Sequence, residues 1–283
     1  MSTAAPPPSD PFGQAPAAPT GQFGQPAPQQ PAPASSGPAA QQPGRPAPGR
    51  DLGADLSASM SWAWKTFTRN LGAFAVPAVV YGLIWASLVI AAVVVGMILM
   101  FSAMNVDPNA APGEGVTIDW GRYIGSMAVM YGGALVASFP LIFWQTGITR
   151  AGRAVIDGRR PGIGEGFSGT GRMLLTALLM TVLTVIGSLL FVIPGMIVAV
   201  LGMLAIPAAA RGAGPVDAIK ESVALVKANL GTAIVTLLVA GAISSAVGMT
   251  VVGVLVAMPI QMLMFEALYE RLRGNELPEP AAA

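Results

Sequence analysis

Four long apolar stretches of the chain contain no charged residue, and their lengths predict how the chain crosses a membrane. They cover residues 70–106, 123–149, 173–210 and 228–265. About 20 residues of helix span a hydrocarbon core of roughly 30 Å, so 123–149 predicts a single span. The other three are too long for one crossing, because at about 1.5 Å per residue each would extend over roughly 55 Å. Each therefore predicts a hairpin of two helices, or one span with excess length.

Turn-forming residues distinguish these two possibilities. Pro194-Gly195 lies in the middle of 173–210, and Gly248 lies near the middle of 228–265. A Pro-Gly pair is a strong turn signal, whereas 70–106 has no comparable break at its centre. The resulting prediction is six transmembrane helices, at about 76–103, 123–147, 173–193, 196–210, 231–247 and 249–267.

The basic residues provide an independent test of this threading. Lys and Arg concentrate in cytoplasmic loops, and six spans with the N-terminus inside leave only Arg122 outside. Both termini are therefore predicted to be cytoplasmic. The predicted cytoplasmic residues are Arg45, Arg50, Lys65, Arg69, Arg150, Arg153, Arg159, Arg160, Arg172, Arg211, Lys220, Lys227, Arg271 and Arg273.

Two segments have the periodicity of amphipathic helices and precede predicted spans. Apolar residues recur at steps of three and four in 55–69 and in 215–229, which predicts interfacial helices with the apolar face toward the membrane. Asp55, Ser59 and Thr66 fall on the other faces of the first segment. Each segment runs into Asn-Leu-Gly, at 70–72 and 229–231, whose glycines we expect to allow the bend into the membrane. The apolar positions are Leu56, Met60, Trp64, Phe67, Leu71, Val216, Ile219, Val223, Val226 and Leu230.

The predicted return helices also share a feature. Pro140, Pro207 and Pro259 each lie in the second helix of a predicted hairpin. Three repeats of an interfacial helix plus a hairpin follow, with the middle unit the least regular. The predicted fold class is thus an all-α polytopic membrane protein, with a six-helix membrane domain over 51–273.

The remaining segments are predicted to lack regular structure. Residues 1–50 hold 14 of the 25 prolines and no cationic residue before Arg45, a composition that cannot support a packed core. We expect a disordered, partly polyproline II tail there, and a second disordered segment over 274–283. The external loop at about 104–121 is expected to be an irregular polar cap. Its carboxylates, Asp107, Glu114 and Asp119, lack the spacing of a calcium loop.

Composition excludes several classes of chemistry. The chain of 283 residues is 53% hydrophobic and 10% charged, where a soluble globular protein carries roughly 25% charged residues. It contains no Cys and no His, which removes thiol chemistry, imidazole bases and the commonest metal ligands. A net charge of +1 gives no reason to expect nucleic acid. We therefore expect no enzyme activity, no catalytic, cofactor-binding or metal-binding residue, and no cofactor.

No ionisable group is expected at membrane depth, which disfavours a proton- or ion-coupled transporter. Small residues at four-residue spacing, Gly121/Gly125 and Ala240/Ser244/Gly248, would permit close helix packing or an interface between copies. Residues 162–166 lack the features of a phosphate loop and are expected to be a flexible linker. Four basic residues before it are expected to anchor the linker at an anionic leaflet: Arg150, Arg153, Arg159 and Arg160. The uncharged polar candidates for interhelical bonding or a substrate site are Gln145, Thr146, Gln261, Ser138, Ser188, Ser244 and Ser245.

Residues 193–229 resemble a known bacterial family of six-helix membrane proteins. The resemblance rests on Ile193-Pro194-Gly195, Ile206-Pro207, the segment 215–222 and Leu225-Val226-Lys227-Ala228-Asn229. The family is the membrane domain that precedes some glycerophosphodiester phosphodiesterases, together with related stand-alone proteins of unknown function. The resemblance covers about 55–272 and implies a six-helix fold. It does not carry the phosphodiesterase activity over, because no catalytic domain follows Arg273 and the chain has no histidine.

These features predict a non-enzymatic accessory or scaffold protein of the bacterial cytoplasmic membrane, with membrane lipids around it and a tail that recruits protein partners. A second hypothesis is a carrier or exporter of an apolar or lipid-like solute, since three hairpins can enclose a passage without charges. A third is a sensor in which the helices at 55–69 and 215–229 respond to lipid packing.

Overall fold

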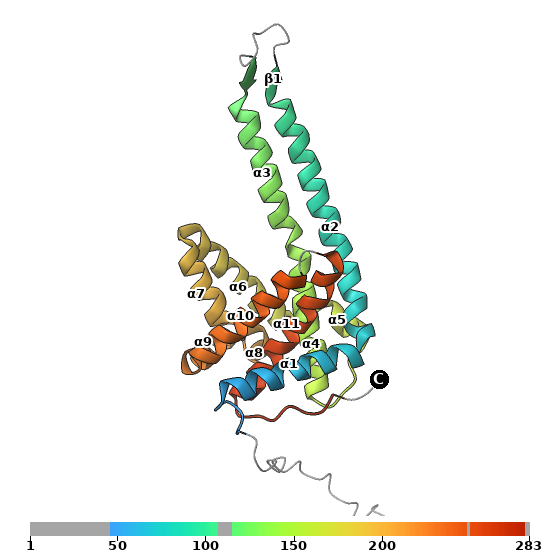
Figure 1. Ribbon diagram of the computed structural model, residues 1–283, viewed down its shortest axis with the longest axis vertical. Helices are drawn as coiled ribbons and strands as arrows, with labels where there is room; N and C mark the ends of the chain where they lie inside the picture. Colours follow the sequence, from blue (N-terminus) through green and yellow to red (C-terminus); the bar gives the residue numbers. More distant parts are fainter. Residues whose placement is uncertain (1–45, 107–114, 248–249, 281–283) are drawn as a thin grey trace, which may run out of the picture. The chain divides into compact units, whose positions relative to one another are not determined.

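The computed structural model describes residues 46–106, 115–247 and 250–280 of the chain. The predicted disorder of the N-terminal tail lies outside these residues, apart from 46–50. The elements run in the order shown in Figure 1: α1 (Leu52–Arg69), α2 (Leu71–Ser102), β1 (Met104–Val106), β2 (Val116–Ile118), α3 (Trp120–Ala137), α4 (Phe139–Ile156), α5 (Ile163–Phe167), α6 (Gly171–Leu190), α7 (Val192–Gly202), α8 (Ala205–Ala210), α9 (Pro215–Ala228), α10 (Leu230–Val247) and α11 (Val251–Leu272).

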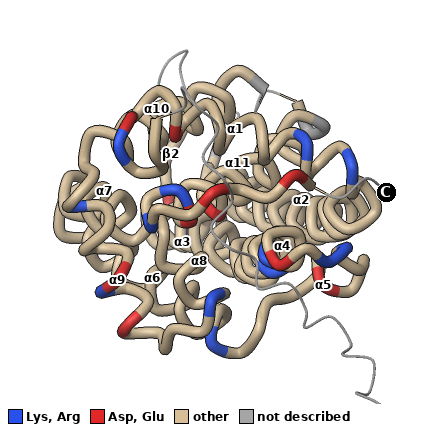
Figure 2. Tube along the Cα trace, turned by 90° about the horizontal axis from the view of Figure 1, so that it is seen from below, with Lys and Arg blue, Asp and Glu red and all other residues tan. Residues whose placement is uncertain are grey.

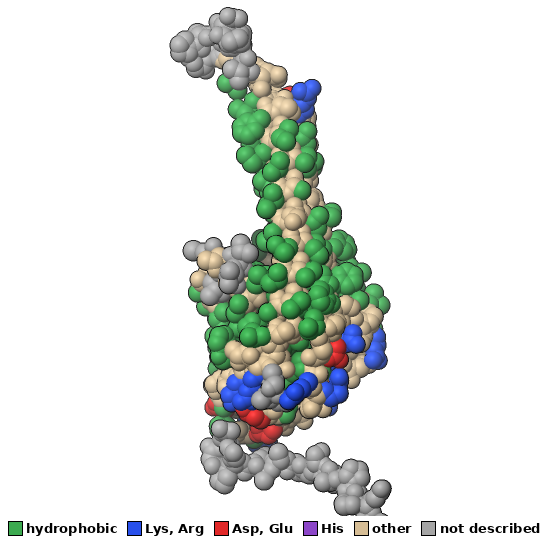
Figure 3. Space-filling view, turned by 90° about the vertical axis from the view of Figure 1, so that its right-hand side faces the viewer, with side chains coloured by type: hydrophobic (Ala, Val, Ile, Leu, Met, Phe, Trp, Pro, Cys, Tyr) green, Lys and Arg blue, Asp and Glu red, His purple; other side chains and the backbone are tan. Residues whose placement is uncertain are grey.

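Long apolar helices confirm a helical, multi-pass membrane protein. Among the described residues five helical stretches are long and apolar enough to span a membrane, and the bent pair of α9 and α10 can provide a sixth. The five are Leu71–Ser102, Trp120–Ile156, Ile163–Leu190, Val192–Ala210 and Gly253–Leu272. Figure 3 shows apolar side chains over the long helices, with most charged side chains of that face gathered at one end.

The two segments predicted to lie at the membrane interface are helices that end in the same way. Asn70 ends α1 and Asn229 ends α9 with nearly equal backbone angles, φ −131° and −135°, ψ 40° and 42°. Each asparagine donates its side-chain N–H to the carbonyl four residues earlier, at 3.0 Å in both cases. The chain then starts a new helix, and α9 and α10 meet at 102°. The bend thus depends on the asparagine; the following glycines lie inside the new helices.

The face of α1 that points into the protein differs from the prediction. Asp55, Ser59 and Thr66 are buried, whereas Trp64 is 54% exposed. The reason is that α1 lies along α11, whose Arg271 pairs with Asp55, whereas the hydroxyls of Ser59 and Thr66 are buried without a hydrogen-bond partner among the described residues. Helix α1 is therefore part of the protein core on one side, and only its other side is free to face a membrane surface.

The turn predicted at Pro194-Gly195 lies three residues earlier. Helix α6 ends at Leu190, Phe191 is extended, and the Pro-Gly pair belongs to the first turn of α7. Gly195 is needed there for close packing, since a Cβ added to it would lie 2.9 Å from the backbone nitrogen of Ser188. The second predicted turn residue, Gly248, lies outside the described residues, between the end of α10 and the start of α11.

The three prolines of the predicted repeat occupy different settings. Pro140 lies at the start of α4, directly after the break at Ser138 that separates it from α3. Pro207 lies in the short α8, whereas Pro259 is inside the continuous α11. The shared proline therefore does not mark one shared structural position.

The loop between α2 and α3 contains regular structure, contrary to the prediction. Strands β1 and β2 pair antiparallel with Met104 opposite Ile118. Asp119 then caps α3 by accepting a hydrogen bond from the backbone N–H of Arg122. This local pairing extends the α2–α3 hairpin beyond its helices. Asp107 and Glu114 lie outside the described residues.

The glycine-rich segment 162–166 is packed rather than a flexible linker. It forms most of α5, where Glu165 accepts a hydrogen bond from the backbone N–H of Gly162 at 3.1 Å. A Cβ on Gly166 would overlap the carbonyl oxygen of Ala73, and one on Gly147 would overlap that of Gly166. The glycines let α5 fit between α2 and α4, which is why the segment is ordered.

Candidate functional site

A cavity of about 410 Å³ lies among α4, α6, α7, α8, α10 and α11. Most of its lining is apolar and includes Met180, Met262 and Phe265. Thr181 and Ala199 at its border are exposed, so the cavity opens on the side of the helical bundle. An apolar cavity with few polar groups is typical of a small-molecule site.

Helices α4 and α6 supply the polar part of the cavity. Gln145 and Thr149 are one turn apart, and the Thr149 hydroxyl donates to the carbonyl of Gln145 at 3.0 Å. Across the cavity the Thr181 hydroxyl donates to the Ala177 carbonyl at 2.8 Å. Because these hydroxyl protons are used within helices, the hydroxyl oxygens and the Gln145 amide are the groups through which a ligand would be oriented.

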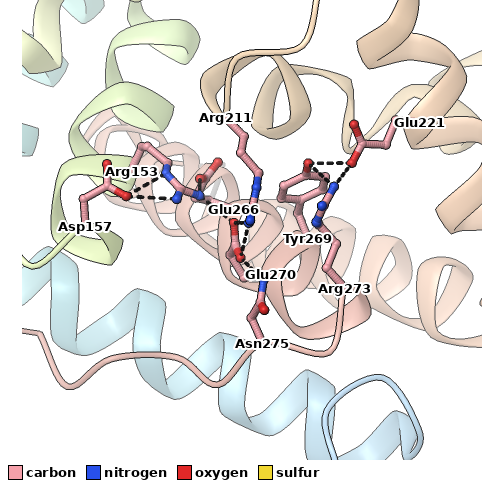
Figure 4. Close-up of polar contacts among 9 residues, drawn as sticks. All are labelled: Arg153, Asp157, Arg211, Glu221, Glu266, Tyr269, Glu270, Arg273 and Asn275. Carbon is pink, nitrogen blue, oxygen red and sulfur yellow. Dashed lines mark hydrogen bonds and ion pairs between the residues drawn. The ribbon is translucent and has the colours of Figure 1, made fainter. Parts of the chain in front are cut away.

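An ionic cluster lies farther along the same faces of α4 and α11 (Figure 4). Arg153 donates to Glu270 at 2.5 Å, and Arg211 donates to both oxygens of that carboxylate at 2.8 Å. The amide of Asn275 adds a third donor at 2.5 Å. Arg153 also pairs with Asp157 at 2.9 Å. Glu270 thus joins three segments that are far apart in the sequence.

Glu266 lies one turn before Glu270 and has a different environment. Its side chain is fully buried, and neither carboxyl oxygen has a hydrogen-bond partner among the described residues. Its nearest cation is Arg153, whose Nη1 is 3.9 Å from Oε1. A buried carboxyl group without donors is costly, which makes Glu266 a candidate functional group.

The cavity and the cluster adjoin each other through two helices. On α4, Gln145, Thr149 and Arg153 follow at four-residue spacing, which places them along one face. On α11, Phe265 lines the cavity and Glu266 belongs to the cluster. Gly152 keeps the two helices close, because a Cβ there would lie 2.7 Å from Leu263 Cδ2.

Two further ion pairs connect α11 to neighbouring helices. Arg271 donates to Asp55 at 2.8 Å in a buried contact with α1. Tyr269 donates to Glu221 of α9 at 2.7 Å, and Arg273 pairs with the same carboxylate. Seen from below, the cationic and anionic residues are interspersed across this end (Figure 2).

The polar residues proposed from the sequence separate into different roles. Gln145 lines the cavity, as a substrate site would require. Thr146 accepts a hydrogen bond from the backbone N–H of Gly169 at 3.2 Å, and Gln261 accepts one from Ser244 at 3.5 Å. Ser138 donates to the Ala134 carbonyl. Ser188 and Ser245 lie outside the cavity lining.

One candidate span contains ionisable groups that the sequence analysis did not single out. Glu266 and Glu270 both belong to the candidate span Gly253–Leu272. In the sequence both carboxylates follow the charge-free run that ends at Phe265, although the predicted sixth span, 249–267, already contains Glu266. Their four-residue spacing on an otherwise apolar helix is the signal that would have placed both on one buried face.

The four arginines at 150–160 do not form one lipid-facing group. Arg153 belongs to the buried cluster, whereas Arg150 donates to the Ser168 carbonyl at 3.2 Å. Arg159 pairs with Glu165 of α5 at 3.4 Å.

Of the two proposed small-residue motifs, Gly125 makes no close contact, since a Cβ there would meet nothing within 4 Å. The closest packing of α2 on α3 instead involves Gly96 and Gly133.

Comparison with known proteins finds distant mycobacterial homologues. The chain is 28% identical over 232 residues to the uncharacterized protein Rv2560 of Mycobacterium tuberculosis and to the uncharacterized protein Mb2590 of Mycobacterium bovis. Each match covers 80% of this chain and 71% of the relative. No protein-family model and no solved structure matches the chain. The resemblance to the phosphodiesterase-associated membrane domain therefore stays a prediction.

Proposed function

We propose that this chain is a non-enzymatic, six-span protein of the bacterial cytoplasmic membrane that binds and carries an apolar or lipid-like solute. Both termini are cytoplasmic in this proposal, and the helices form three hairpins. The observation that supports it most is the cavity of about 410 Å³ beside α4, α6 and α11. Its opening toward the side of the bundle suits a solute that enters from the bilayer.

The lining suits an amphiphile with a small polar group. Met180 and Met262 provide flexible apolar contacts that adapt to acyl chains of different shape. Gln145 provides both a donor and an acceptor for an ester, hydroxyl or amide group of the solute. A water-soluble or charged substrate would find no paired charge among the residues that line the cavity.

Lipid movement in reconstituted vesicles tests this proposal. The purified chain would be placed in proteoliposomes containing a nitrobenzoxadiazole-labelled phospholipid, and dithionite quenching would report probe exchange between leaflets. Thr181→Trp fills the mouth of the cavity and should slow exchange at least tenfold, and Gln145→Ala should slow it severalfold. Gln261→Ala is the matched control, because that amide bonds to Ser244 outside the cavity.

Two results would refute the carrier proposal. One is exchange no faster than in protein-free vesicles. The other is protein-dependent exchange that Thr181→Trp leaves unchanged, because movement would then not pass through this cavity.

The composition of residues 1–50 favours a second candidate function. A segment with 14 prolines cannot pack a core but can bind cytosolic partners in an extended form. The chain would then act as a membrane scaffold whose tail recruits partners. Affinity purification with the full chain and with 1–45 deleted tests this, and identical partner sets would contradict it.

A further inference from the structure

The last described residues turn back and follow α1 (Figure 1). Helix α11 ends at Leu272, and Gly274 adopts φ +83°, a left-handed conformation that favours glycine. The backbone N–H of Asn275 then donates to the Glu270 carbonyl at 3.0 Å. Residues 276–280 continue without helix or strand structure. We call them the C-terminal segment.

Specific donors on α1 bind this segment. The indole N–H of Trp62 donates to the Pro278 carbonyl at 3.0 Å, and Arg69 donates to the Pro280 carbonyl. Between these contacts, the carboxylate of Glu279 pairs with Lys65 at 3.4 Å and with Arg69 at 3.0 Å. The contacts advance along α1 and along the segment in the same direction, as in a peptide bound in a groove.

The chemistry of these contacts selects a particular kind of peptide. Proline has no backbone N–H, so a surface that binds a proline-rich segment must donate hydrogen bonds to its carbonyls. Aromatic-lined grooves recognise extended proline-rich peptides in this way. Two cations beside the middle residue add a requirement for a carboxylate. A glutamate flanked by prolines, as in Pro278-Glu279-Pro280, meets both requirements.

The C-terminal segment does not fill the groove in which it lies. A cavity of about 530 Å³ remains, lined on the α1 side by small residues that include Ala54, Ser57, Ala58 and Ser61. The ion pairs are also open to solvent, with Lys65 46% and Glu279 65% exposed. Exposed ion pairs contribute little to stability, so the Glu279 end of the segment is displaceable, while Glu276 keeps its start attached to Arg271 at 3.0 Å.

We propose that the groove formed by Trp62, Lys65 and Arg69 of α1 is a docking site for an extended peptide of a cytosolic partner in which a carboxylate is flanked by prolines. The C-terminal segment occupies the groove within the chain and limits access to it. This inference is independent of the cavity and of solute transport, because no residue of the groove lines that cavity.

Binding of a free peptide to the full chain tests the proposal. The protein would be placed in phosphatidylcholine nanodiscs, and a fluorescent peptide with the sequence of residues 274–283 would be titrated by anisotropy. Glu279→Arg in the protein repels the C-terminal segment from Lys65 and Arg69. We expect this variant to bind the peptide at least tenfold more tightly than the unsubstituted chain, because a tethered occupant competes at high effective concentration.

Substitutions in the groove then identify the donors. In the Glu279→Arg background, Trp62→Phe keeps an aromatic ring but removes the indole donor, and Arg69→Ala removes a cation. Each should weaken binding at least fivefold. Trp64→Phe is the matched control, since Trp64 is exposed and belongs to no groove contact; it should leave the affinity unchanged. A peptide with glutamine in place of its second glutamate should also bind at least fivefold more weakly.

Three results would overturn the proposal. The first is the absence of saturable peptide binding to the Glu279→Arg protein. The second is binding that Trp62→Phe and Trp64→Phe weaken equally. The third is a Glu279→Arg protein that gains affinity for vesicles containing phosphatidylglycerol but not for the peptide, which would assign the face to anionic lipid instead.

Discussion

Helices α2 and α11 both satisfy the criteria for a membrane span, yet they occupy opposite environments. In the most apolar 18-residue window of α2 only 6% of residues are buried in the protein, against 67% in α11. Helix α2 is free of charge throughout its length, whereas α11 contains Glu266, Glu270 and Arg271. The more apolar helix therefore faces the surroundings, and the more polar one forms the centre of the protein.

The difference follows from the solvent. Lipid is as apolar as a leucine side chain, so an apolar surface gains little from leaving it, and helices associate through close packing and polar contacts. Helix α2 packs on α3 where Gly96 and Gly133 allow close approach. Helix α11 binds α1, α4 and α9 through carboxylates, arginines and Tyr269. Of these two helices, the buried one is therefore the one with polar partners and not the more hydrophobic one.

The largest effect is expected when the shared carboxylate is removed. Glu270→Ala leaves the largely buried Arg153 with Asp157 as its remaining close partner and removes the partner of the exposed Arg211, which should lower the free energy of unfolding by about 3–5 kcal/mol. Glu266→Gln is the control in the same helix. It removes a carboxylate that has no hydrogen-bond donor, so its effect should stay within about 1 kcal/mol, or be stabilising. Chemical denaturation in detergent micelles measures both, and equal losses would contradict the assignment of Glu270 as the organising group.

Truncation of an apolar side chain should lower the free energy of unfolding much more in α11 than in α2. Leu268 of α11 is completely buried, so Leu268→Ala should cost about 2–5 kcal/mol through lost packing and a cavity. Leu83 of α2 is 65% exposed, and Leu83→Ala should cost less than about 0.5 kcal/mol. The same denaturation experiment compares the pair. A similar cost at both positions would mean that α2 is as closely packed as α11.

Substitution of glycines should have effects of intermediate size on the free energy of unfolding. A Cβ at Gly166 would overlap the backbone oxygen of Ala73, which cannot move independently, so Gly166→Ala should cost about 1–3 kcal/mol or more. At Gly96 the added methyl meets the side chain of Met130, which can change rotamer, so Gly96→Ala should cost less. Gly125→Ala, which meets nothing, is the control. Thermal unfolding followed by circular dichroism ranks the three, and the reverse order for Gly166 and Gly96 would contradict the packing of α5.

The smallest predicted effect is a pH dependence of the C-terminal segment. The hydrogen bond from Lys65, with the nearby charge of Arg69, lowers the pKa of Glu279 below its usual range. A lowered pKa means that docking is at full strength at neutral pH and weakens as the pH falls through the lowered value. Fluorescence of Trp62 should therefore change on acidification in the unsubstituted chain. The change should be absent in Glu279→Gln, and its persistence there would assign the titration to another group.

Several features could be predicted because they depend on neighbours in the sequence. Charge-free runs of known length indicated a multi-pass membrane protein, since insertion depends on local hydrophobicity. The repeated Asn-Leu-Gly located the bends after α1 and α9, although the asparagine, through its bond to the preceding turn, ends each helix. Gln145 could be proposed as a site residue because an amide in an apolar span is rare.

What the sequence alone could not decide is which residues meet across the fold. Arg153 lies 117 positions from Glu270, and Asp55 lies 216 positions from Arg271, so no local pattern links them. The inward face of α1 depends on the presence of α11, and the order of α5 depends on space left between α2 and α4. The pattern of apolar and polar residues along a helix shows which of its faces prefers an apolar environment and which a polar one. The tertiary structure decides whether that environment is lipid or another part of the protein.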